Sequence, residues 1–127
     1  MKKTVTFGEI MLRLKTPEHL RIVQTDGFEA SYGGAEANVA VSLANYGMDA
    51  SFFTVLPSNR LGDACIQELR KFGVDTRKIQ RGSGRMGIYF LESGANQLPS
   101  KVIYDRADSA LSLAQPGSVD WDSVLSG

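Results

Sequence analysis

Residues 32–40 read Tyr32-Gly33-Gly34-Ala35-Glu36-Ala37-Asn38-Val39-Ala40, two adjacent glycines that run directly into a segment of small and branched apolar residues. Because glycine lacks a Cβ atom, Gly33 and Gly34 allow another molecule to approach the backbone where a strand turns into a helix. The first-turn N–H groups of such a helix have no intrahelical partners and suit an anion or hydroxyl oxygens. Asn38 adds an amide that donates and accepts. The stretch is therefore either a ligand site or an ordinary strand-to-helix turn capped by Asn38.

Strand-like and helix-like segments alternate around this stretch. The patterns predict strands at 4–7, 10–15, 51–56 and 77–80, a buried helix at 35–46 and an amphipathic helix at 61–72. Two further short strands, 21–25 and 28–32, are predicted to form a ribbon around the Asp26-Gly27 turn. The alternation indicates an α/β fold with a parallel-type sheet. In such sheets ligands bind beyond the carboxyl ends of the strands, which is where the glycine pair lies.

A second candidate binding surface is predicted in a hairpin formed by 86–92 and 101–106. Side chains alternate along a strand, so Tyr104 and Arg106 share a face of the second strand, and Tyr89 lies on the first. A guanidinium with two phenols suits a small acidic polyol. The alternative is a solvated hairpin in which Arg106 pairs with Asp105 or Asp108.

Composition excludes several classes of function. The chain has 14 basic and 14 acidic residues, so no net field attracts nucleic acid or an anionic membrane surface. The chain has one cysteine, Cys65, which excludes an internal disulfide and favours a reducing compartment. With one histidine, His19, it also has too few ligands for a cysteine/histidine zinc site. The pattern at 61–72 puts Cys65 on the apolar face as an inert core thiol. No apolar run approaches the ~18 residues of a membrane span, and we expect a cytoplasmic protein.

Two motif-like patterns carry no site. Gly82-Ser83-Gly84-Arg85-Met86-Gly87 matches G-x-G-x-x-G, but an alternating strand follows where a dinucleotide site needs a helix, and the sequence has no P-loop. Asp105 and Asp108 have no third carboxylate nearby, so surface pairing and capping of the turn at 109–111 are favoured over a metal site.

The residues quoted above carry a family resemblance. The segment from Tyr32 to Ala40, the helix start Leu61-Gly62-Asp63, the strand with Tyr89, and Tyr104-Asp105-Arg106 resemble the N-terminal part of the ribokinase-like (pfkB-type) carbohydrate kinases. Within that family the chain is most similar to the branch that phosphorylates 2-keto-3-deoxygluconate. Glu36 stands where many members have a small residue and Pro57 where many have glycine, and both suit that branch.

The resemblance implies a three-layer α/β fold with a small β-sheet lid, of which residues 1–127 are the N-terminal portion and 10–32 and 86–106 the lid segments. It implies transfer of the γ-phosphoryl group of ATP to a sugar hydroxyl, with Mg²⁺ balancing phosphate charge. Sugar would bind between Gly33, Gly34 and Asn38 below and Tyr89, Tyr104 and Arg106 above. The family's aspartate base and nucleotide pocket are expected beyond Gly127, so no catalytic, cofactor or metal residue is predicted here.

We therefore expect residues 1–127 alone to be inactive and to be poorly stable or to associate through uncovered apolar faces. A homo-oligomer formed through the lid is also expected. Two alternatives stay open: a noncatalytic sugar-binding or dimerisation module, and a fructokinase- or ribokinase-type enzyme that acts on a neutral sugar.

Overall fold

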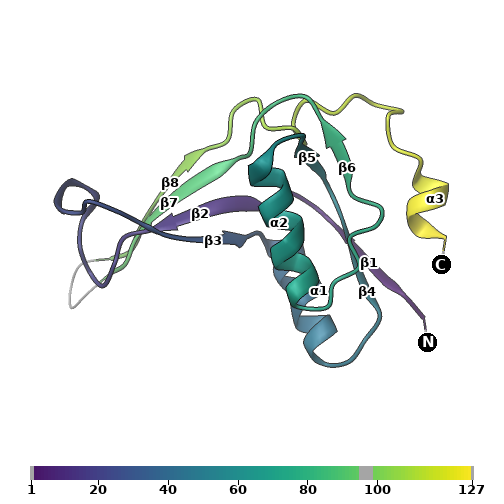
Figure 1. The fold of residues 1–127 in the computed structure, drawn as a ribbon, viewed down its shortest axis with the longest axis horizontal. Helices are drawn as coiled ribbons and strands as arrows, with labels where there is room; N and C mark the ends of the chain where they lie inside the picture. Colours follow the sequence, from purple (N-terminus) through teal and green to yellow (C-terminus); the bar gives the residue numbers. More distant parts are fainter. Residues whose placement is uncertain (1, 95–98, 127) are drawn as a thin grey trace.

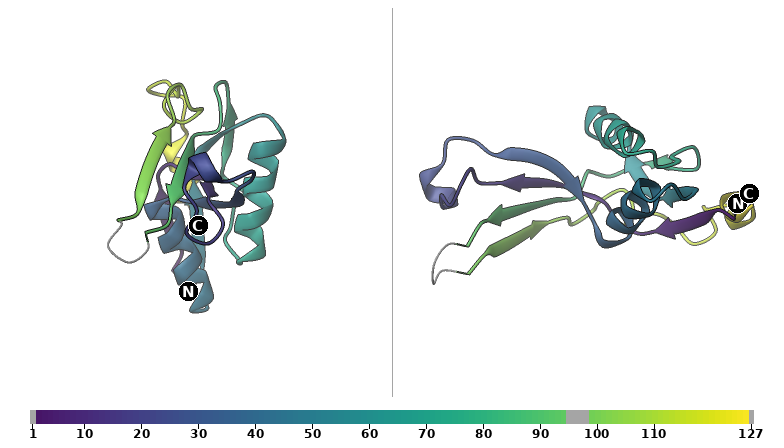
Figure 2. Two further views of the ribbon diagram at one scale, coloured as in Figure 1. Left: turned by 90° about the vertical axis from the view of Figure 1, so that its left-hand side faces the viewer. Right: turned by 90° about the horizontal axis from the view of Figure 1, so that it is seen from below.

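The computed structural model describes residues 2–94 and 99–126. It consists of a body, in which helices pack on parallel strands, and a four-stranded sheet that extends away from the body (Figure 1). We call this second part the arm sheet. Both ends of the described chain lie at the side of the body opposite the arm sheet, and the lengthwise view shows how far the arm extends (Figure 2).

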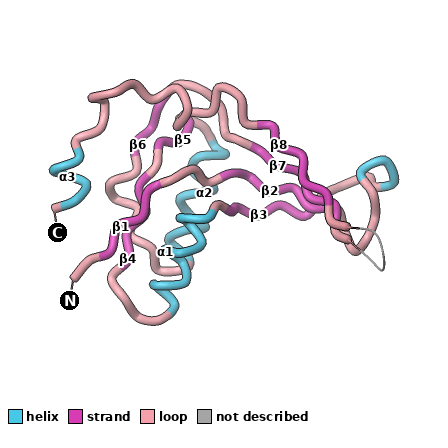
Figure 3. The backbone as a smooth tube through the Cα atoms, turned by 180° about the vertical axis from the view of Figure 1, so that it is seen from behind, coloured by secondary structure: helices cyan, strands magenta, loops and turns pink. Residues whose placement is uncertain are grey.

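The body contains two parallel strand pairs. β1 (Thr4–Phe7) pairs with β4 (Ala50–Phe53), and β5 (Val55–Pro57) pairs with β6 (Gln80–Gly82). Helix α1 (Ala35–Asn45) packs on β1 and β4, and helix α2 (Arg60–Lys71) contacts β5. The predicted α/β class with a parallel-type sheet is confirmed (Figure 3).

Strands β4 and β5 are covered on two faces, as the apolar run at 51–56 predicted. Phe52 belongs to the core cluster beneath the two helices, and it is fully buried. Because side chains alternate along a strand, Phe53 points to the opposite face, where its ring lies 5.5 Å from that of Trp121 in α3 (Trp121–Leu125). The cluster beneath the helices consists of Ile10, Ala37, Ala40, Phe52, Leu56, Cys65, Leu69, Val74 and Met86.

The arm sheet has the strand order β3-β2-β7-β8. β2 (Met11–Lys15) is antiparallel to β3 (Glu29–Gly33) and parallel to β7 (Ile88–Glu92), which is antiparallel to β8 (Lys101–Asp105). The predicted hairpin is therefore confirmed, with Tyr89 directly opposite Tyr104. Residues 95–98 of the loop between its strands lie outside the described residues.

The strand predicted at 21–25 is wrong. Residues Ile22–Gln24 form a short 3-10 helix, η1, and β3 pairs with β2 in place of the expected ribbon partner. The reason is that side chains accept hydrogen bonds from the backbone here. The N–H of Arg21 donates to Oε1 of Gln24 at 2.9 Å, and the N–H of Ile22 donates to Oε2 of Glu92 at 3.1 Å. These bonds replace those of a strand ladder.

Two strand boundaries and the burial of one helix also differ from the prediction. The run at 51–56 is divided into β4 and β5 at Thr54. The strand expected at 77–80 begins only at Gln80, because Asp75 accepts a hydrogen bond from the N–H of Arg77 at 3.0 Å and closes a turn first. Helix α1 is buried on one face only, since Val39 is 49% exposed in the part of the chain that the structure describes.

Candidate functional site

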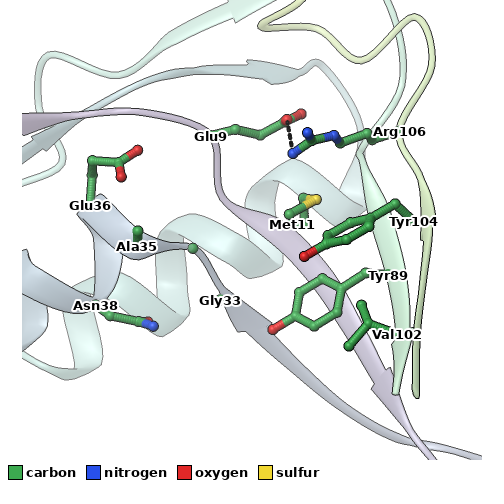
Figure 4. Close-up of a pocket in the computed structure, with 11 residues that line it drawn as sticks. Glu9, Met11, Gly33, Ala35, Glu36, Asn38, Tyr89, Val102, Tyr104 and Arg106 are labelled. Carbon is green, nitrogen blue, oxygen red and sulfur yellow. Dashed lines mark ion pairs between the residues drawn. The ribbon is translucent and has the colours of Figure 1, made fainter. Parts of the chain in front are cut away.

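A pocket of about 530 Å³ lies where the arm sheet joins the body (Figure 4). All six residues that the sequence singled out for ligand binding line it: Gly33, Gly34, Asn38, Tyr89, Tyr104 and Arg106. They come from the end of β3, the start of α1, and the two strands of the hairpin. The structure thus brings together two sequence segments that are more than fifty residues apart.

The glycine pair forms one wall of the pocket because other atoms approach it closely. A Cβ atom on Gly33 would lie 2.8 Å from the hydroxyl of Tyr89, and one on Gly34 would overlap the backbone carbonyl of Glu9. Gly34 is the N-cap of α1 and no side chain caps that helix among the described residues. Asn38 is exposed and lines the pocket, so the alternative in which it caps the turn is not what the structure shows.

The opposite wall comes from the arm sheet. Tyr89 and Tyr104 are paired across β7 and β8, and their ring centroids are 5.9 Å apart. The guanidinium carbon of Arg106 lies 5.1 Å from the centroid of the Tyr104 ring, within the range of a cation–π contact. Figure 4 shows both phenol hydroxyls directed toward Gly33 and the pocket. This wall therefore presents hydroxyl groups and a cation together.

The ion pair of Arg106 differs from the pairs considered for a solvated hairpin. Its Nη1 atom lies 3.6 Å from Oε1 of Glu9, on the body side of the pocket. Asp105 instead pairs with Arg85 at 2.6 Å, and hydrogen bonds from that guanidinium lower the pKa of Asp105. The turn after Asp108 is held by Ser109, whose hydroxyl accepts from the N–H of Ser112. The expected capping by Asp108 is therefore wrong.

Sequence reasoning missed five lining residues: Glu9, Met11, Ala35, Glu36 and Val102. Two of them bring negative charge, since the carboxylates of Glu9 and Glu36 both face the pocket (Figure 4). Glu9 follows β1 directly after Gly8, at the carboxyl end of a parallel strand, where ligands of α/β sheets bind. That rule, applied to β1 as well as to the glycine pair, would have found it.

The remaining candidates carry no site in the described part of the chain. Cys65 is fully buried in α2, and burial raises the pKa of its thiol to about 12, as expected for an inert core thiol. The G-x-G-x-x-G match leads into β7 and not into a helix. Within 2–94 and 99–126 no three His, Cys, Asp or Glu side chains are placed to hold a metal ion. No helix in these ranges has the length and apolarity needed to cross a bilayer.

Comparison with known proteins gives consistent matches. Residues 1–126 match the family described as pfkB family carbohydrate kinase. The chain is 41% identical over 120 residues to the 2-dehydro-3-deoxygalactonokinase of Haloferax volcanii, an alignment that covers 94% of this chain and 38% of that protein. The crystal structure of the 2-dehydro-3-deoxygluconokinase of Thermotoga maritima superposes with a TM-score of 0.96 at 62% identity, over 98% of this chain and 38% of that one.

A nucleotide complex is also among the structural matches. An uncharacterized sugar kinase from Pyrococcus horikoshii in complex with ATP superposes with a TM-score of 0.83 at 29% identity, over 95% of this chain and 39% of that chain. The chain thus spans a little more than a third of the length of each of these three relatives.

Proposed function

The chain belongs to the pfkB family of carbohydrate kinases, and from this we propose that the complete protein transfers the γ-phosphoryl group of ATP to a hydroxyl of a small sugar acid, 2-keto-3-deoxygluconate or its galactonate epimer. The activities for which the Haloferax and Thermotoga relatives are named support this choice of substrate. The observation that carries the proposal is the pocket in which Arg106, Tyr89 and Tyr104 face the glycine pair.

Each lining group has a role in this proposal. Backbone N–H groups near Gly33 and Gly34 and the amide of Asn38 hold sugar hydroxyls, since the start of α1 leaves such donors without intrahelical partners. The hydroxyls of Tyr89 and Tyr104 hold the sugar from the other wall. Arg106 binds the substrate carboxylate, because a guanidinium matches that group with two parallel hydrogen bonds.

In this proposal the pocket residues position the sugar, and other groups of the complete protein carry out the phosphate chemistry. ATP supplies the phosphoryl group when it is bound. The pocket residues fix the sugar so that one hydroxyl is held still for attack, and closely held reactants account for a large part of catalysis. We assign no ATP or Mg²⁺ ligand in the described residues, where no set of metal-binding side chains is found.

Residues 10–32 and 86–106, which contain the strands of the arm sheet, are proposed as the lid over the sugar. We further propose that this lid pairs with that of a second copy. Ile103 in β8 is 51% exposed, and Phe28 is 38% exposed beside Phe90, so the lid carries apolar surface that a partner can cover. Sedimentation of the complete protein and of an Ile103→Lys variant tests this, with a smaller assembly expected for the variant.

A substrate panel tests the function itself. The complete protein is assayed for ATP consumption with 2-keto-3-deoxygluconate, 2-keto-3-deoxygalactonate, fructose and ribose at matched concentrations. We expect the highest kcat/KM with one of the two acids. Faster phosphorylation of fructose or ribose would favour the neutral-sugar alternative, and no phosphorylation of any sugar would favour the noncatalytic one.

A further inference from the structure

The charges around the pocket do not match those expected of a simple anion site. Among the residues that line it, Arg106 carries a positive charge and Glu9 and Glu36 carry negative charges. The pocket as described therefore has more negative than positive charge. A site for a bare anion would be expected to have the opposite balance.

Glu9 forms an ion pair with Arg106 but leaves the hydrogen-bond donors of the Arg106 guanidinium without a protein acceptor in the described residues. The 3.6 Å between Oε1 of Glu9 and Nη1 of Arg106 is within reach of an ion pair but longer than a hydrogen bond. In residues 2–94 and 99–126, no hydrogen bond from the guanidinium of Arg106 to a protein acceptor is found. The donors of Arg106, whose side chain is 53% exposed, thus stay available to a ligand.

The surroundings of Glu9 allow its carboxylate to lie close to Arg106. Its side chain is only 21% exposed. A Cβ atom on Gly87 would lie 3.0 Å from Oε2 of Glu9 and 3.1 Å from Cβ of Arg106, so the glycine lets the two side chains approach. On the other side, the backbone carbonyl of Glu9 packs against Gly34. The carboxylate of Glu9 therefore lies beside Arg106 in a largely covered side chain.

We propose that Glu9 is a specificity-determining residue, which restricts Arg106 to anions that also carry hydroxyl groups and so excludes simple anions from the pocket. A small anion on Arg106 lies close to the carboxylate of Glu9 and is repelled by it. A polyhydroxy acid places hydroxyl donors against that carboxylate, and the hydrogen bonds offset the repulsion. The inference rests on the proposed function, because it takes the ligand of this pocket to be a sugar acid.

The test compares Glu9→Gln with the complete wild-type protein. Glutamine keeps an acceptor oxygen beside Arg106 and removes the charge. Binding of sulfate and acetate is measured by calorimetry at constant ionic strength, along with the KM for 2-keto-3-deoxygluconate. We expect the variant to bind the simple anions about fivefold or more tightly than wild type, as estimated for one unit charge removed near a partly exposed site. The change in KM for the sugar acid should be smaller, because the amide oxygen accepts weaker hydrogen bonds from the sugar hydroxyls than the carboxylate does, and this loss offsets the lost repulsion.

Two controls separate this role from a general one. Glu29→Gln makes the same change of charge at an exposed position on β3 outside the pocket lining, and it should leave anion binding unchanged. Glu9→Asp keeps the charge and should still reject sulfate and acetate. A variant that is merely less well folded loses affinity for every ligand, so a selective gain for simple anions cannot come from damage.

Equal sulfate and acetate affinities in wild type and Glu9→Gln would overturn the inference, and so would an equal gain in Glu29→Gln. Failure of the proposed function has a different signature: wild type neither binds nor phosphorylates any sugar acid. The anion measurements do not depend on turnover, so the two failures are distinguishable.

Discussion

Replacement of Arg106 by alanine tests the assignment of the substrate carboxylate. The guanidinium lies beside Tyr104 and Glu9 with its donors available to a ligand. A hydrogen bond to a charged group contributes about 1.5–3 kcal/mol. Because the side chain is 53% exposed, we take the lower part of that range, about 2 kcal/mol, which corresponds to a roughly 30-fold rise in KM for the sugar acid.

The assay is steady-state kinetics of the complete protein with 2-keto-3-deoxygluconate and with a neutral sugar that it phosphorylates slowly. For the neutral sugar, Arg106→Ala should change KM by less than about threefold, because such a substrate has no carboxylate to lose its partner. Arg106→Lys should fall between wild type and alanine, since it keeps the charge but not the planar fork.

Arg85→Ala is the matched control, since it removes the same side chain from a residue that pairs with Asp105 but does not line the pocket. Equal increases in KM for the acidic and the neutral sugar in Arg106→Ala would refute the reasoning. The same acid-specific loss in Arg85→Ala would do so as well.

Three further predictions concern the fold around the site. Gly34→Ala forces a methyl group against the carbonyl of Glu9 and should lower the free energy of unfolding by about 1–3 kcal/mol in a denaturant titration. Gly27→Ala, which has open space around it, should change the free energy of unfolding by less than about 0.5 kcal/mol. Equal losses in the two variants would contradict the packing argument. Cys65 is fully buried with a raised pKa, so a thiol reagent at mildly alkaline pH should label it only after denaturant is added, and rapid labelling of the folded protein would contradict its burial. Hydrogen bonds from Arg77, and further from Lys3, hold the pKa of Asp75 well below its ordinary value, so the ionised carboxylate stabilises the fold above about pH 4 and this contribution is lost as the pH falls further. Wild type should exceed Asp75→Asn in stability at neutral pH by a margin that shrinks in acid, and a margin independent of pH would show that the charge is not involved.

The pocket residues that sequence reasoning found are those fixed by local rules. Gly33 and Gly34 mark a backbone constraint, and Asn38 follows by helical spacing. Tyr104 and Arg106 are found because strand side chains alternate, and Tyr89 because a hairpin places a second strand beside the first. None of these steps needs knowledge of the tertiary structure. These rules do not say which segments of the chain meet, so the grouping of the six residues into one site came from the family resemblance, and all six do line one pocket.

Some features that sequence reasoning missed, such as the pairing of Glu9 with Arg106, depend on contacts between distant segments. Glu9 meets Arg106 because β2 lies beside β7, a parallel pairing that no local pattern specifies. The exposure of Val39 in α1 likewise depends on what packs against the helix, and composition alone cannot tell which face stays open. At Ile22–Gln24 the hydrogen bond from the N–H of Arg21 to the side-chain amide of Gln24 favours a 3-10 helix over the strand that a weak alternation of apolar residues predicted.

Four short segments connect the arm sheet to the body and lie side by side: residues 8–10, 33–34, 86–87 and 105–106. Three of these connecting segments contain a glycine, and the residues that line the pocket lie in or next to the four segments. The connection between the two parts of the molecule and the wall of the pocket are thus built from the same short stretches of backbone. A substitution that shifts the arm sheet relative to the body would therefore also reshape the pocket, even if it touched none of the side chains that line it.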